Sequence, residues 1–113
     1  MDGTLTDGGV ALDGQGGEWK RFDIQDGMGI ARLQREGVEV ALISGRRSEA
    51  TARRAAELGI REVVNGIREK LPALKDLSDS RGLTADEVCY VGDDVNDMDC
   101  ILWSGLGVAV RNA

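Results

Sequence analysis

The chain has 113 residues, 42% of them hydrophobic and 30% charged, a composition that suits one soluble globular domain over residues 1–113. Its net charge of −6 argues against a nucleic-acid or anionic-membrane partner, because either would favour a basic surface. The chain contains no histidine, which excludes Ser-His, Cys-His and histidine-ligated zinc chemistry. Cys89 and Cys100 lack metal-ligand spacing, and no signal peptide or membrane segment is visible, so a cytoplasmic location is expected.

The first half of the chain predicts a hairpin, a helix and a buried strand. Residues 10–12 and 19–22 flank a glycine-rich turn, which is typical of a β-hairpin. A helix is expected from about residue 26 to residue 36, and Gly37 ends it. The nearly continuous apolar run 38–43 is typical of a parallel strand that is buried on both faces.

The second half continues the alternation of strands and helices. Helices are expected at about 48–58 and 69–80, with a short strand at 62–64 between them. Strands at 88–91 and 107–110 enclose a short helix. Strands that alternate with helices in this way predict a doubly wound α/β sheet with right-handed crossovers.

Polar residues follow the expected strands at their carboxyl ends, where open α/β sheets form their sites. Ile43 runs into Ser44-Gly45-Arg46, Val91 runs into Gly92-Asp93-Asp94, and Lys70 begins a helix. Taken singly, these residues also suit an ordinary loop, a helix N-cap and a surface lysine. Taken together, the carboxylates, the hydroxyl and the lysine suit Mg²⁺ and a phosphate ester.

The segment Asp2-Gly3-Thr4-Leu5-Thr6-Asp7-Gly8 has the form of a turn that follows a buried strand. We therefore expect a hydrophobic strand upstream of Met1, and a domain that is truncated at both ends. Losing a central strand would leave unpaired sheet edges. The 113 residues alone are accordingly expected to be marginally stable or to associate.

The motifs DGTLTDG, LISGR, Lys70 and GDDVND, in this order, resemble those of the haloacid dehalogenase superfamily of phosphotransferases. The segments FDIQDGMGI, SGRRSEATARRAAELGI, NGIREKLPAL and VCYVGDDVNDMD further resemble the 3-deoxy-D-manno-octulosonate 8-phosphate phosphatase family. The resemblance spans essentially the whole chain. It implies a three-layer α/β/α, Rossmann-like domain with a small β-hairpin flap and no large cap, assembled as a homotetramer.

The resemblance also implies Mg²⁺-dependent hydrolysis of a small acidic sugar phosphate through an aspartyl-phosphate intermediate, with 3-deoxy-D-manno-octulosonate 8-phosphate as the expected substrate. In the family's Asp-x-Asp motif the first aspartate attacks phosphorus, and the second acts as acid and then base. Asp2 matches the second aspartate, which places the nucleophile immediately before Met1. The 113 residues alone are therefore expected to be inactive. Ser44 matches the phosphate-binding hydroxyl, and Lys70 matches the lysine that steadies the phosphoryl group.

The expected metal site also follows from the resemblance. Asp93 matches the direct Mg²⁺ ligand, joined in the family by the backbone carbonyl at Asp2. Asp94 and Asp97 match acidic positions around the metal and the lysine. The residues expected to bind the substrate are Asp23, Ile24, Gln25, Asp26, Gly27, Gly45, Arg46 and Arg54.

Two other functions stay open. Ala31 stands where the family often has a basic residue, so the sugar could instead be a nonulosonate 9-phosphate. Similar domains are also fused to acylneuraminate cytidylyltransferases, which makes a non-catalytic oligomerisation domain the third reading. The expected hairpin suits either a plain surface role or packing against neighbouring subunits.

Overall fold

Strands and helices alternate along the chain in the computed structural model, which describes residues 4–6, 11–12, 18–19 and 22–110. The elements are β1 Ala11–Leu12, β2 Glu18–Trp19, α1 Ile24–Arg35, β3 Ala41–Ile43, α2 Glu49–Glu57, β4 Glu62–Val64, α3 Lys70–Ser80, β5 Cys89–Gly92, α4 Met98–Trp103 and β6 Leu106–Ala109. Two 3₁₀ turns, η1 Ala85–Glu87 and η2 Val95–Asp97, precede β5 and α4. The predicted alternation is confirmed.

Three strand pairs make up the described sheet structure. β1 and β2 form the predicted antiparallel hairpin, although Val10, residues 13–17 and residues 20–21 lie outside the described part. β3 pairs with β4 and β5 pairs with β6, both in parallel register. Among the described residues the two parallel pairs share no backbone hydrogen bonds, so side chains join the two halves.

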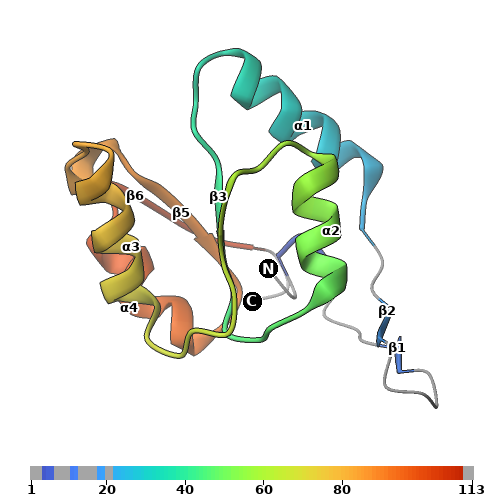
Figure 1. Cartoon of the computed structure of the whole chain (residues 1–113). Coiled ribbons are helices and arrows are strands. Elements are labelled where there is room, and N and C mark those ends of the chain that lie inside the picture. Colours follow the sequence, from blue (N-terminus) through green and yellow to red (C-terminus); the bar gives the residue numbers. More distant parts are fainter. Residues whose placement is uncertain (1–3, 7–10, 13–17, 20–21, 111–113) are drawn as a thin grey trace.

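The core is divided between the two faces of the β3–β4 pair. One cluster comprises residues of α1, β3, α2 and the turn before β4: Ile30, Leu42, Ala55 and Ile60. The other comprises residues of β3, α3, β5 and α4: Ile43, Leu74, Tyr90 and Cys100. Successive strand residues point to opposite faces, so Leu42 and Ile43 serve different clusters. Figure 1 shows the resulting layers, with α1 and α2 on one side of β3 and α3 and α4 on the other.

Glycines end the three longest helices in the same way. Gly37, Gly59 and Gly82 each have a positive φ, a conformation that glycine adopts without strain. After α1, the Gly37 N–H donates to the carbonyl of Gln34, and the Val38 N–H donates to that of Leu33. These bonds explain one error of the sequence analysis: the predicted strand 38–43 is only Ala41–Ile43, because its first residue closes the preceding helix.

Polar side chains set the beginnings of α1 and α2. The Asp23 carboxylate accepts from the Gln25 N–H at 2.7 Å, so α1 begins at Ile24, two residues before the predicted start. Ser48 caps α2 in the same manner, accepting from the Thr51 N–H at 3.3 Å. Side-chain caps thus fix helix boundaries that the apolar spacing alone leaves open.

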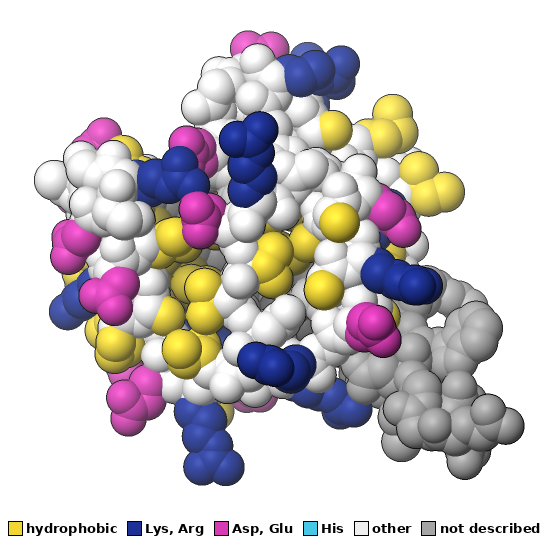
Figure 2. Space-filling model, in the orientation of Figure 1, with side chains coloured by type: hydrophobic (Ala, Val, Ile, Leu, Met, Phe, Trp, Pro, Cys, Tyr) yellow, Lys and Arg dark blue, Asp and Glu magenta, His cyan; other side chains and the backbone are white. Residues whose placement is uncertain are grey.

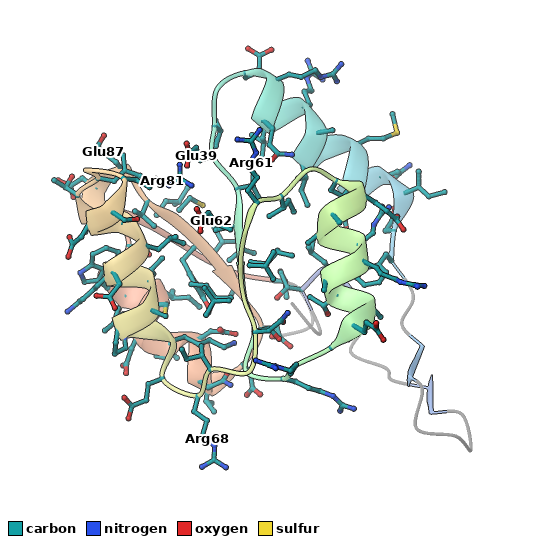
Figure 3. The ribbon with its side chains drawn as sticks, in the orientation of Figure 1. Glu39, Arg61, Glu62, Arg68, Arg81 and Glu87 are labelled. Atoms are coloured by element: carbon teal, nitrogen blue, oxygen red, sulfur yellow. The ribbon has the colours of Figure 1, made fainter. Side chains whose placement is uncertain are left out.

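A small ion-pair network lies at the amino end of the strands, away from the candidate site. The Arg81 guanidinium, at the end of α3, pairs with Glu39 at 2.8 Å and also with Glu62 (Figure 3). All three side chains are at least one-third exposed, so each pair is worth about 1 kcal/mol or less. The network therefore helps to align α3 with the β3–β4 pair without dominating stability.

The described surface mixes charges of both signs. On the face shown in Figure 2, Lys and Arg side chains alternate with Asp and Glu. Within the described residues, no helix has both the length and the hydropathy needed to cross a membrane.

Candidate active site

The loop after β3, the start of α3 and the η2 turn converge on one small volume. A Cβ atom built on Gly45 would lie 3.4 Å from the Ile67 carbonyl oxygen, 3.9 Å from Asn96 Nδ2 and 4.0 Å from Lys70 Cε. These elements meet because the carboxyl ends of parallel strands lie at one edge of the fold. The structure thus brings the predicted residues Gly45 and Lys70 together.

A buried ion pair stands at the centre of this volume. Lys70 Nζ lies 2.8 Å from Asp97 Oδ1, and the two residues are only 7% and 2% exposed. The Tyr90 hydroxyl donates to the same Oδ1 at 2.6 Å. Burial, followed by the bond to Asp97, raises the pKa of Tyr90, so its hydroxyl keeps the proton that it donates.

The second oxygen of Asp97 organises the loop that follows β5. Oδ2 accepts from the backbone N–H groups of Asp93 and Asp94, at 3.1 and 3.3 Å. A Cβ atom on Gly92 would lie 2.6 Å from both Cβ and Cγ of Asp97, so only glycine allows this close approach. Burial alone would raise the pKa of Asp97, but hydrogen bonds from Lys70, Tyr90 and the Asp93 N–H lower it to about 2. Asp97 is therefore ionised at neutral pH.

Asp93 and Asp94 have different environments. The half-buried Asp93 carboxylate has a raised pKa, first because of burial and then because of the negative charge on Asp97. No donor in the described part of the chain is hydrogen-bonded to this carboxylate, whereas Asp94 Oδ1 accepts from the Val95 N–H at 2.6 Å and caps η2. Asp93 is thus the better placed of the two to bind a cation.

The described residues fit a magnesium ion in part. Mg²⁺ is commonly held by one or two carboxylates together with phosphate oxygens and water. Asp93 supplies one such carboxylate, and Asp2 lies outside the described residues. Within the described residues no group of three or more acidic or cysteine side chains gathers into a closed metal cage. The donor set therefore suits an open site that phosphate completes.

Ser44 is buried at the end of β3, where its backbone N–H donates to the Val64 carbonyl at 2.8 Å. Its hydroxyl donates to the Arg46 carbonyl at 2.9 Å and accepts from the Arg46 N–H at 3.3 Å. The hydroxyl can donate to a phosphate oxygen only by turning its proton away from the Arg46 carbonyl. Ser44, Gly45 and Arg46 therefore form a compact turn beside Lys70.

The other residues predicted to bind the substrate lie at the start of α1 and, in the case of Arg54, on the neighbouring helix α2. The Arg54 guanidinium lies 5.9 Å from the centre of the Phe22 ring and pairs with Glu57 at 3.1 Å. A Cβ on Gly27 would clash with Arg54 Nη2 and lie 3.0 Å from Leu58 Cδ2, so glycine makes room for the guanidinium. Four predicted residues of the same segment are exposed: Asp23, Ile24, Gln25 and Asp26. The residues predicted to bind the substrate therefore lie in two groups, this one and the Ser44–Arg46 turn.

Sequence reasoning missed the contribution of Tyr90 and left the contacts of Asp97 unspecified. Tyr90 was taken only as part of an apolar strand, yet its hydroxyl reaches Asp97. Asp97 was placed by the resemblance among the acidic positions around the metal and the lysine, and the structure adds that its two oxygens bind Lys70, Tyr90 and two backbone N–H groups. The sequence did offer one signal for the role of Tyr90. It is a tyrosine, whose hydroxyl can donate a hydrogen bond, two residues before the glycine that ends the strand.

Comparison with known proteins identifies the class of protein. The family model for haloacid dehalogenase-like hydrolases matches residues 59–113. The crystal structure of a HAD family hydrolase from Streptomyces avermitilis MA-4680 matches with a TM-score of 0.94 and 39% identity, over 99% of this chain and 68% of that chain. The chain therefore belongs to the haloacid dehalogenase-like hydrolases.

Two further matches are phosphatases that are named after the same substrate. The 3-deoxy-D-manno-octulosonate 8-phosphate phosphatase KdsC of Haemophilus influenzae is 40% identical over all 113 residues, which span 63% of that relative. The corresponding phosphatase of Moraxella catarrhalis, crystallised with a magnesium ion, a phosphate ion and a KDO molecule, matches with a TM-score of 0.96 and 38% identity, over 99% of this chain and 64% of that chain. The chain thus spans 60% to 63% of the curated relatives described by this name. The similarity confirms the predicted α/β/α fold class.

Proposed function

We propose that the full-length gene product is a Mg²⁺-dependent phosphatase that acts on 3-deoxy-D-manno-octulosonate 8-phosphate. The observation that carries the proposal is the buried Lys70–Asp97 pair, which lies beside the Ser44–Arg46 turn and the Asp93 loop. Relatives at about 40% identity over the whole chain are phosphatases of this sugar phosphate. A cytoplasmic homotetramer is part of the proposal.

Each residue of the proposed site has one task. Asp97 holds the Lys70 ammonium at the edge formed by the carboxyl ends of the strands. There the ammonium binds a phosphoryl oxygen and stabilises the negative charge of the transition state. The Ser44 hydroxyl binds a second phosphoryl oxygen. The Asp93 carboxylate and the backbone carbonyl of Asp2 would hold Mg²⁺. When bound, the metal neutralises phosphate charge.

The covalent steps follow the family resemblance. An aspartate immediately before Met1 attacks phosphorus, the bond from phosphorus to the sugar oxygen breaks, and Asp2 gives its proton to that oxygen. Asp2 then accepts a proton from the water that hydrolyses the aspartyl-phosphate. The sugar carboxylate is bound by the guanidinium groups of Arg46 and Arg54, because a forked donor matches a carboxylate.

The test is phosphate release by the full-length gene product from three esters, with Mg²⁺ or with a chelator. The esters are 3-deoxy-D-manno-octulosonate 8-phosphate, N-acetylneuraminate 9-phosphate and p-nitrophenyl phosphate. We expect Mg²⁺-dependent release, with kcat/KM for the first ester at least about 100-fold above that for p-nitrophenyl phosphate, since binding energy from the sugar is used in the transition state.

Two results would overturn the proposal. A higher kcat/KM for the 9-phosphate would reassign the substrate to the nonulosonates. No release from any ester would instead favour a non-catalytic oligomerisation domain.

A further inference from the structure

We propose that Tyr90 is a positioning residue of this site, whose hydroxyl fixes the Asp97 carboxylate so that Lys70 and the Asp93 loop meet the phosphate in the productive geometry. The inference rests on the proposed function for its kinetic consequence. Its structural part, the control of the Asp97 orientation by Tyr90, stands on the described contacts alone.

Tyr90 joins the apolar core to the polar site. Its ring packs in the cluster with Ile43, Leu74 and Cys100, and the residue is only 8% exposed. Its hydroxyl lies 2.6 Å from Asp97 Oδ1, the oxygen that also accepts from Lys70. A hydroxyl bound to a carboxylate makes a short, strong hydrogen bond. The ring therefore gives Asp97 a rigid reference that is anchored in the core.

The other partners of Asp97 cannot supply this reference. The carboxylate torsion of an aspartate is soft, with broad and roughly two-fold preferences. Lys70 approaches on a flexible four-carbon stem, and its ammonium can follow a turning carboxylate. The N–H donors of Asp93 and Asp94 belong to the loop that Asp97 itself organises. Removing the Tyr90 hydroxyl therefore frees the carboxylate, the ammonium and the loop to move together.

Such a movement is expected to change kcat more than KM. The proposed function assigns Lys70 and the Asp93 loop to the reacting phosphate, whereas Arg54 contacts Glu57, Phe22 and Gly27, none of which is a partner of Asp97. Misplacement of reacting groups by about 1 Å can lower a rate by about 100-fold. For Tyr90→Phe, which keeps the ring, we expect a smaller shift, with kcat lowered by about 10-fold and KM changed by less than about 2-fold.

The experiment compares Tyr90→Phe with Ser78→Ala in the full-length gene product. Ser78 is a matched control because it is also buried and loses a hydroxyl bond, to the Leu74 carbonyl at 2.8 Å, within α3. The readouts are kcat, KM, the thermal midpoint, and the NMR shifts of the Asp93 and Asp94 amide protons. We expect both variants to lose some thermal stability, but only Tyr90→Phe to lower kcat and move the two amide shifts.

The outcomes separate this inference from the proposed function. An active wild type with unchanged kcat in Tyr90→Phe would overturn the positioning role. Amide shifts that do not move in Tyr90→Phe would overturn it as well, even in a protein without phosphatase activity. An inert wild type whose two amide shifts move in Tyr90→Phe alone would overturn the proposed function and support Tyr90 as the residue that orients Asp97.

Discussion

Replacing Lys70 with methionine is expected to lower the free energy of unfolding by about 3 kcal/mol and to remove phosphate release by the full-length gene product. The substitution keeps most of the apolar stem but leaves the Asp97 carboxylate, which is 2% exposed, without its cation. Removing one partner of a buried ion pair costs about 3–5 kcal/mol, and Tyr90 and two backbone N–H groups still compensate part of the charge. Urea denaturation and phosphate release measure the two effects.

The stability loss of Lys70→Met is expected to depend on pH. In the wild type the pKa of Asp97 is lowered from its ordinary 3.8 to about 2, so its contribution is present above pH 3.8 and lost as the pH falls through 2. Without Lys70, that carboxyl protonates at higher pH, which relieves the buried charge. The difference between the two proteins should therefore shrink in acid.

Lys75→Met is the matched control for this prediction. Lys75 lies on the same helix and is exposed, so its replacement is expected to change stability by less than about 0.5 kcal/mol. A loss in Lys70→Met no larger than that in Lys75→Met, or one that is constant from neutral pH down to about pH 2, would contradict the assigned pairing.

The substitution Gly92→Ala is expected to lower the free energy of unfolding by about 2 kcal/mol, because overpacking a tight site costs about 1–3 kcal/mol. The added methyl group would lie 2.6 Å from Cβ and Cγ of Asp97, closer than two unbonded carbon atoms can come. Asp97 must move away from the backbone of β5, and its bonds to Lys70 and to the Asp93 loop must lengthen. Phosphate release is therefore expected to fall together with stability.

Gly29→Ala provides the comparison for Gly92→Ala. Gly29 lies in α1, and nothing approaches within 4 Å of a Cβ built there. Alanine is favoured over glycine inside a helix by about 0.8–1.0 kcal/mol, so this variant is expected to gain stability. Equal thermal midpoints for the two alanine variants would show that Asp97 does not lie against Gly92 as described.

Much of the fold could be predicted because its signals are local. The alternation of strands and helices follows from apolar periodicity, and Gly37 and Gly59 end helices where the sequence predicts. The strand 38–43 was predicted too long because hydropathy does not show that Val38 completes a helix-ending turn. The start of α1 was predicted too late because the apolar spacing does not reveal the Asp23 cap.

The sequence predicted which edge of the sheet carries the candidate site. It did not predict which hydrogen bonds join the residues of that site. Ser44, Lys70 and Asp93 follow from strand ends, because parallel strands bring their carboxyl ends together. The family resemblance placed Asp94 and Asp97 around the metal and the lysine, but the choice of Asp97 as the partner of Lys70 depends on how β5 and η2 fold over Gly92, which is a tertiary feature. For the same reason, neither the Tyr90 hydroxyl nor the packing of Arg54 against Gly27 could be derived from spacing.

The most direct test of the central claim, a metal-dependent phosphatase site on the Asp93 loop, is the Mg²⁺ dependence of phosphate release. The full-length gene product, its Asp93→Asn variant and its Asp94→Asn variant are assayed with 3-deoxy-D-manno-octulosonate 8-phosphate. We expect no release in chelator, and at least about a 10-fold higher half-saturating Mg²⁺ concentration in Asp93→Asn, because a carboxylate is a far better Mg²⁺ ligand than an amide. Asp94→Asn should change this concentration much less, since an amide oxygen can still cap Val95. Full release in chelator, or an unchanged Mg²⁺ requirement in Asp93→Asn, would contradict the claim.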